Sequence, residues 1–256
     1  MNAVQGIFFG LLIACTACGG CTSKSTAKPT PETVQPGLAK PVAASARFTT
    51  VRVDLRTERL ELFLRDEKGH AFNRFDQLAS WLAGRKQQLR FAMNAGMYQT
   101  DFSPVGLLVV DGREISPLNV AAGSGNFFMK PNGVFLVSNV GPRIVETSEY
   151  PTIVQDVRLA TQSGPLLLRK GVINPAFDPA STSRLLRNGV GISGDTIVFV
   201  ISDQPVNFYE FAVFFRDHLQ CSDALYLDGV VSSLYSVDLK RNDNKTDLGP
   251  IVAVVQ

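Results

Sequence analysis

The sequence predicts an α+β domain with a mixed β-sheet core and a few packed helices. Short apolar runs bounded by turn residues recur after residue 46, which is typical of strands. Clear helical spacing of apolar residues occurs in two stretches, 74–84 and 208–219. The second stretch joins two apolar strands, so we expect a strand-helix-strand crossover near the C-terminus.

Composition narrows the class of protein before any motif is considered. The chain has 256 residues, of which 45% are hydrophobic and 19% charged, as in an ordinary globular protein. Its formal net charge of +2 gives no reason to expect nucleic acid as a partner. We expect the folded part to be a monomer.

Residues 1–21 are typical of an export signal. The apolar run Ile7–Ala14 is too short to span a membrane and has the length of a signal-peptide core. Leu12–Cys15 resembles a bacterial lipobox, which predicts lipidation of Cys15 and a membrane anchor. Cys18 and Cys21 are weaker candidates for lipidation, and a secreted protein without lipid is the alternative.

Residues 22–45 are rich in Ser, Thr, Pro, Ala and Lys, a composition that cannot bury a core and predicts an extended tether. The folded domain is then expected over residues 46–256. We expect the protein to be exported to the bacterial cell envelope, on the periplasmic or outer-membrane side.

The domain begins with strands. Phe48–Leu55 and Leu60–Leu64 alternate apolar and polar residues, as a half-buried pair would. Leu89–Met93 is the next strand, and it runs into Asn94–Tyr98. The Asn94 amide, close to Gly96 at the strand end, can bind a ligand hydroxyl. The alternative is a turn that this amide stabilises.

The middle of the chain contains turn signals and small residues. Pro131–Gly133 predicts a β-hairpin, and we expect a short helix at Val154–Leu159. Gln162–Pro165 opens a buried strand. Its small residues Ser163 and Gly164 would let a ligand lie against the backbone, although Gly-Pro alone marks only a loop.

Two acids are expected at one edge of the sheet. Thr196–Ile201 is predicted to be a buried strand followed by Asp203, and Ala224–Leu227 a buried strand followed by Asp228 and Gly229. The helix between them would connect the strands in parallel. The two carboxylates would then lie at the same edge, which favours a site over a plain turn.

Further polar residues flank these strands. Gly229 gives a ligand room, and Ser232 and Ser233 supply hydroxyls. Arg184 and Arg187 lie shortly before the Thr196–Ile201 strand. A guanidinium group there suits phosphate; the alternative is solvated surface charge.

The positions of the histidines and cysteines argue against a zinc site and against a Ser-His-Asp triad. The histidines are His70 and His218, and neither has a His or Cys partner at zinc-ligand spacing. His218 ends the predicted helix, where a cation favours the helix dipole, so a Ser-His-Asp triad is disfavoured. Cys221 is predicted to be a lone buried thiol.

Five motifs together resemble the phosphodiester glycosidase family, and the resemblance spans about residues 48–255. In chain order they are Asn94–Tyr98, Gln162–Leu166, Arg187–Ile192, Val200–Asp203 and Tyr226–Ser233. The better-known members have a glycine-rich run where this chain has Val230 and Val231, so it looks closer to a bacterial branch.

The resemblance implies hydrolysis of a sugar-1-phosphodiester at the anomeric carbon, giving free sugar and a phosphomonoester. Asp228 and Asp203 would be the carboxylates, as nucleophile or general base, and Arg187 would hold the phosphate. The residues implied to contact substrate or to leave space for it are Asn94, Gly96, Ser163, Gly164, Arg187, Asn188, Gly229, Ser232 and Ser233.

Two alternatives remain open on the sequence alone. One is a non-catalytic cell-envelope module that binds a glycan or an anionic polymer, motivated by the two valines after Gly229. The other is a divalent cation in the acidic site. We expect no cofactor and no resident metal.

Overall fold

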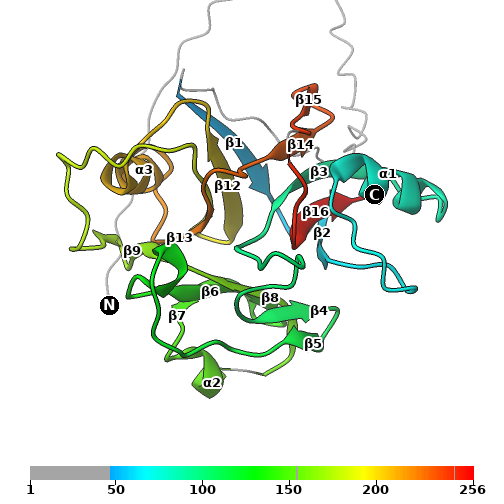
Figure 1. Ribbon diagram of the computed structural model, residues 1–256, viewed down its shortest axis with the longest axis horizontal. Helices are drawn as coiled ribbons and strands as arrows, with labels where there is room; N and C mark the ends of the chain where they lie inside the picture. The colour runs from blue at the N-terminus through cyan, green and yellow to red at the C-terminus, as the bar shows by residue number, and fades with distance from the viewer. Residues whose placement is uncertain (1–46, 154, 245) are drawn as a thin grey trace, which may run out of the picture. The chain divides into compact units, whose positions relative to one another are not determined.

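The computed structural model describes residues 47–153, 155–244 and 246–256, and these ranges form three β-sheets with few helices (Figure 1). The expected signal, the tether and Cys15 lie outside the described residues. Within the described ranges, no helix is long and apolar enough to cross a membrane.

The first sheet has six strands and carries the acidic end of the chain. Its order is β1-β12-β11-β13-β9-β10. The strands are β1 (Phe48–Val53), β12 (Thr196–Ser202), β11 (Asn188–Ser193), β13 (Asp223–Asp228), β9 (Leu166–Arg169) and β10 (Val172–Ile173).

The second and third sheets have five strands each. The second is β15 (Arg241–Asn242), β14 (Leu234–Ser236), β3 (Leu89–Asn94), β16 (Ile251–Val255) and β2 (Arg59–Phe63). The third is β5 (Arg113–Ser116), β4 (Leu108–Val110), β8 (Val157–Ser163), β6 (Gly133–Ser138) and β7 (Gly141–Glu146).

Helices are short. They are α1 (Phe75–Ala83), α2 (Tyr150–Ile153), a 3₁₀ turn (Asn126–Phe128) and α3 (Phe208–Val213), which continues as a π-helical turn (Phe214–His218). Helix α3 begins with a capping box. The Asn207 side chain accepts from the Glu210 N–H at 2.8 Å, and the Glu210 carboxylate accepts from the Asn207 N–H at 3.1 Å.

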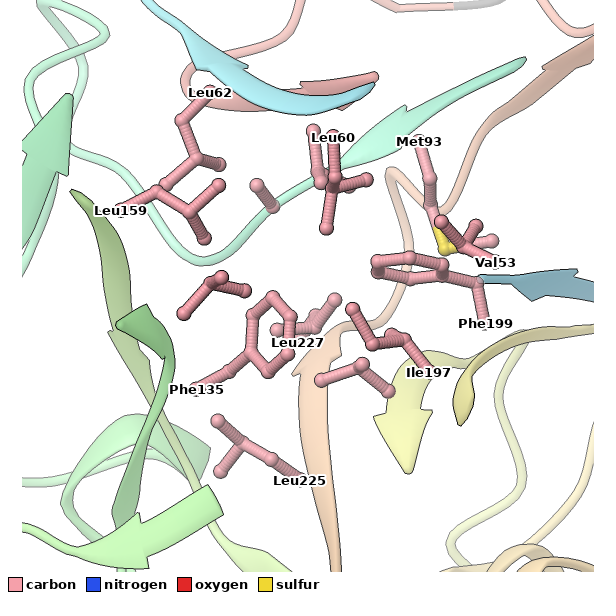
Figure 2. Packing of buried hydrophobic residues seen from close by; sticks show 14 of the residues in the cluster. Val53, Leu60, Leu62, Met93, Phe135, Leu159, Ile197, Phe199, Leu225 and Leu227 are labelled. Atoms are coloured by element: carbon pink, nitrogen blue, oxygen red, sulfur yellow. The ribbon is translucent and has the colours of Figure 1, made fainter. Parts of the chain in front are cut away.

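The three sheets share one apolar core, and Figure 2 shows side chains from each of them pointing toward one another. Strand β12 is a nearly continuous run of apolar residues because both of its faces are buried. Its residues Ile197 and Phe199 face this shared core, whereas Val198 and Val200 face a second cluster that includes α3. Apolar contacts on both faces leave no polar position inside the strand.

The expected mixed sheet is wrong, because every strand pair in the described ranges is antiparallel. Helix α3 does join β12 to β13, but β11 lies between these strands and pairs antiparallel with both. Strands β12 and β13 therefore run in the same direction without pairing. Their C-terminal ends still reach the same edge, since Asn188 lies opposite both Ile201 and Asp228.

Three local expectations also need correction. Strands β1 and β2 do not pair with each other, because β1 joins the first sheet and β2 the second. The region expected to be a helix at Val154–Leu159 already belongs to β8 from Val157 onward. The hairpin expected at Pro131–Gly133 does not form, because Asn126–Phe128 is a 3₁₀ turn and β6 pairs with β7 and β8 instead.

Candidate active site

Asp228 is the last residue of β13 and lies partly buried at the edge of the first sheet. Its Oδ1 accepts a hydrogen bond from the Gly229 N–H at 2.6 Å. Burial raises the pKa of Asp228 to about 6, and the Gly229 N–H and the Asn94 amide oppose that shift. A carboxyl that titrates near neutral pH can exchange a proton under ordinary conditions.

Two buried asparagines connect Asp228 to the second sheet. Asn188 Nδ2 donates to the Asn94 carbonyl at 2.9 Å and to Asn94 Oδ1 at 3.1 Å, and neither side chain is exposed. Asn94 Oδ1 also accepts from the Ser233 N–H at 3.0 Å. The amides therefore hold together β3, β11 and the loop that follows Asp228.

That loop, Gly229–Ser233, contains the two serines expected in the site. Ser232 Oγ lies 3.3 Å from Asn188 Oδ1 and 3.2 Å from the Asp228 carbonyl, and it donates toward them. Ser233 Oγ donates to the Val231 carbonyl at 3.0 Å. Both hydroxyls thus help to shape the loop beside Asp228.

Gly229 is required by its neighbour rather than by its backbone angles. A Cβ built at this position would lie 2.5 Å from Tyr226 Oη, closer than real Cβ atoms approach. Tyr226 is 1% exposed, and burial raises its pKa to about 12. Tyr226 begins one of the motifs singled out in the sequence, but no role was predicted for its hydroxyl, because inside an apolar strand it carries no signal beyond its alternation with Leu225 and Leu227.

Strand β8 brings Ser163 to the same strand end. Ser163 is fully buried, and its Oγ donates to the Leu227 carbonyl at 2.9 Å, one residue before Asp228. At Gly164 a Cβ would lie 2.6 Å from Asn132 Cβ, and at Gly96, with φ of 144°, 3.1 Å from Thr161 Oγ1. These two glycines are therefore used for close packing of the strands behind the site.

Asp203 has a different environment from Asp228. Its Oδ1 accepts from Arg241 Nη1 at 2.6 Å, and its Oδ2 accepts from Thr49 Oγ1 at 2.7 Å. None of these contacts involves Asn94, Asn188 or Asp228. Asp203 does line a cavity of about 110 Å³ together with residues Val230–Ser233 of the loop.

Arg187 is buried behind the site, with 1% of its surface exposed. Its Nε donates to the Val206 carbonyl at 2.9 Å and its Nη2 to the Ser183 carbonyl at 3.1 Å. Its Cζ lies 3.8 Å from the centre of the Phe208 ring. Burial lowers the pKa of Arg187, and the nearby Tyr226 hydroxyl opposes that shift.

The guanidinium of Arg187 keeps one unused donor. Nη1 is buried and has no hydrogen-bond partner, and no ion pair to Arg187 occurs in the described ranges. Burying an unpaired charge is costly, so an anion close by would stabilise this residue. The nearby Arg184 differs, because it pairs with Glu210 at 2.6 Å.

Tyr98 is a further neighbour of Asp228. Its Oη donates to the Asp247 carbonyl at 2.6 Å. Burial, with the carboxylates of Asp228 and Asp247, raises the pKa of Tyr98 to about 12. Tyr98 belongs to a motif singled out in the sequence, but nothing in that motif indicated how near it lies to Asp228.

The expected residues thus divide into two groups. Asn94, Asn188, Ser232 and Ser233 form one hydrogen-bonded group with Asp228. Asp203 and Arg187 occupy separate positions beside it. Within the described ranges, no group of three or more His, Cys, Asp or Glu side chains is arranged to hold a metal ion.

An acid with a raised pKa, held among amides and hydroxyls at a sheet edge, is a candidate site for a polar, hydroxyl-rich ligand. Comparison with known proteins narrows this class. A family model described as phosphodiester glycosidase matches residues 87–254, and the chain belongs to the phosphodiester glycosidase family.

Individual relatives are consistent with that assignment. The Escherichia coli (strain K12) protein YigE, named an uncharacterized protein, is 38% identical over 199 residues, covering 77% of this chain and 76% of that one. The solved catalytic domain of zebrafish N-acetylglucosamine-1-phosphodiester alpha-N-acetylglucosaminidase, auto-inhibited by its pro-peptide, shares the fold. Its TM-score is 0.56, with 14% identity and coverage of 86% of each chain.

A second solved structure also shares the fold. It is a Burkholderia pseudomallei K96243 protein proposed to be exported, with a TM-score of 0.52 and 13% identity. The match covers 81% of this chain and 73% of that one.

Proposed function

We propose that this domain hydrolyses a sugar-1-phosphodiester at its anomeric carbon. The bond between the anomeric carbon and the bridging oxygen breaks, water supplies the new anomeric hydroxyl, and the phosphate leaves as a phosphomonoester. The observation that carries the proposal is the Asp228 carboxyl. Its pKa is near 6, and it lies among the amides and hydroxyls of the site.

Asp228 is assigned the chemical step. At neutral pH it is mostly ionised, which suits a nucleophile or a general base next to an oxocarbenium-like transition state. The leaving phosphate is a weak base, so it needs charge stabilisation more than it needs a proton.

Asp203 is given a supporting role, although it was expected to be the second catalytic carboxylate. Both of its oxygens already accept short hydrogen bonds, from Arg241 and Thr49. A carboxylate held in this way is less free to attack carbon. Its Asn variant should therefore lose less activity than Asp228→Asn.

Arg187 is proposed to supply positive charge for the phosphate. Its buried Nη1 has no hydrogen-bond partner, and the charge is offset by aromatic rings rather than by a carboxylate. Because Arg187 is 1% exposed, contact with the phosphate would require neighbouring side chains to move aside. Asn188 and Ser232, which lie next to Asp228, are proposed to hydrogen-bond substrate oxygens.

The test is product release by the full chain from a panel of sugar-1-phosphodiesters that vary in sugar and aglycone. Asp228→Asn should abolish turnover, Arg187→Met should lower kcat/KM, and Asp238→Asn should behave as wild type. Turnover retained by Asp228→Asn would refute the assignment. Tight glycan binding in calorimetry without any turnover would instead favour the binding module, which the exposed Val230 beside the site also suits.

Export is a separate part of the proposal. The structural relative from Burkholderia pseudomallei K96243 is itself proposed to be exported, and the N-terminal sequence resembles a signal with a lipobox. We expect Cys15→Ala to release the protein from membranes into the soluble envelope fraction. Retention at the membrane by this variant would contradict lipidation at Cys15.

A further inference from the structure

Arg241 joins two carboxylates that are distant in sequence. Its Nη1 donates to Asp203 Oδ1 at 2.6 Å, and its Nε donates to Asp243 Oδ2 at 2.9 Å. Its Nη2 lies 2.8 Å from the same Asp243 oxygen. We refer to these three residues, Asp203, Arg241 and Asp243, as the Arg241 clamp.

The clamp connects two sheets. Asp203 directly follows β12 of the first sheet, at the edge where Asp228 ends β13. Arg241 begins β15, the outer strand of the second sheet. The side chain of Arg241 is only 25% exposed, so its ion pairs are partly shielded from solvent.

The clamp also reaches the loop beside Asp228. Asp243 Oδ2 accepts from the Leu234 N–H at 3.1 Å, and the Asp243 N–H donates to the Leu234 carbonyl at 2.9 Å. Leu234 directly follows Ser233, the last residue of the Gly229–Ser233 loop. The clamp and Val230–Ser233 together line a cavity of about 110 Å³. The clamp therefore lies against the loop and is bonded to the residue that follows it.

We propose that Arg241 is a positioning residue, whose clamp fixes the Gly229–Ser233 loop and thereby holds the Asp228 carboxyl in its desolvated place. The proposal deepens the proposed function and rests on the role given to Asp228 there. Without the guanidinium, Asp203 and Asp243 would repel each other across the cavity. The loop would then shift and admit water to Asp228.

The chain offers a matched control at the other end of the same hairpin. Arg90 Nη2 donates to Asp238 Oδ1 at 2.8 Å, with side-chain exposures of 21% and 26%. This pair ties β3 to the turn between β14 and β15, but it contacts neither the loop nor Asp228. Arg90→Met therefore removes a comparable ion pair from the same hairpin.

The experiment is a carbon-13 NMR titration of the Asp228 carboxyl in the full chain, with Asp228→Asn used to assign the signal. In Arg241→Met we expect the pKa of Asp228 to fall by about 1 unit or more from its value near 6, toward its ordinary value of 3.8. Loss of a positive charge alone would raise this pKa, so a fall reports water entry. Arg90→Met should leave it unchanged.

An unchanged or raised pKa in Arg241→Met, or an equal fall in Arg90→Met, would overturn the proposal. If Arg241→Met does not fold by circular dichroism, Arg241→Lys takes its place with the same expected fall, because lysine lacks the planar fork that holds both carboxylates. The titration needs no substrate, so a failure to find turnover would leave its outcome intact.

Discussion

At the scale of residues, Asp228 is subject to opposing effects. Burial disfavours its charged form, while one backbone N–H and one amide favour that form. The pKa rises to about 6 because burial is the larger effect. Asp203 has a different set of contacts, with an arginine and a hydroxyl donating to its two oxygens. The two acids therefore have different chemistry although both end apolar strands.

The raised pKa predicts that Asp228 costs stability at neutral pH. The folded state holds the proton more tightly than the unfolded chain, whose carboxyl titrates near 3.8. The contribution of this group is thus fully present below about pH 4 and is lost as pH rises through about 6. A shift of this size corresponds to roughly 3 kcal/mol at most.

Asp228→Asn should accordingly raise the melting temperature at pH 8 by several degrees, with little change at pH 4. Asp238→Asn, at the ion pair with Arg90, serves as the control. Differential scanning calorimetry at the two pH values measures this. An equal effect of Asp228→Asn at both pH values would mean that Asp228 titrates normally in the folded protein.

The contact between Gly229 and Tyr226 makes a second prediction at this scale. In Gly229→Ala the new methyl group meets Tyr226 Oη at 2.5 Å, so we expect a loss of about 1–3 kcal/mol. Removing the hydroxyl in Gly229→Ala/Tyr226→Phe should return part of that loss. Chemical denaturation of the two single variants and the double variant gives the coupling energy, and a value near zero would show that the clash is relieved elsewhere.

At the scale of elements, α3 connects β12 to β13 and helps position the site. Its cap Asn207 is fully buried and serves two purposes. The Oδ1 accepts from the Glu210 N–H, and the Nδ2 lies 3.1 Å from the carbonyls of both Pro179 and Ser181. The cap therefore also holds the segment that leads to Arg187.

Asn207→Ala should cost more than an ordinary helix cap, which is worth about 1 kcal/mol. We expect a loss of about 2 kcal/mol, because the carbonyls of Pro179 and Ser181, in partly buried hydrogen bonds, lose their donor as well. Asn139→Ala, at an exposed amide bonded to Asp156, should cost less than about 0.5 kcal/mol. Urea denaturation of both variants compares them, and equal losses would mean that the Asn207 contacts contribute little.

At the scale of the whole molecule, the sequence predicted most strands but not how they pair. Apolar runs and turn residues locate β3, β12 and β13, since these depend on local pattern. The insertion of β11 between β12 and β13 depends on contacts that no local pattern encodes. The expected parallel pairing failed for that reason.

The site shows the same division. Asn94, Asn188, Ser232 and Ser233 were predicted as site residues because each lies in a motif near a glycine or an acid, and in the structure they are hydrogen-bonded to one another. The partner of Asp203 could not be found, because Arg241 lies 38 residues further along the chain. No role was predicted for the Tyr226 hydroxyl, because within an apolar strand a tyrosine follows the same pattern as an apolar residue.

Cleavage at the anomeric carbon is the central claim, and the position of oxygen incorporation tests it most directly. A sugar-1-phosphodiester that the protein turns over is hydrolysed in water enriched in oxygen-18, and both products are analysed by mass spectrometry. We predict the label in the released sugar and none in the phosphomonoester. Label in the phosphomonoester would mean that the phosphorus–oxygen bond breaks, and that the protein acts as a phosphodiesterase instead.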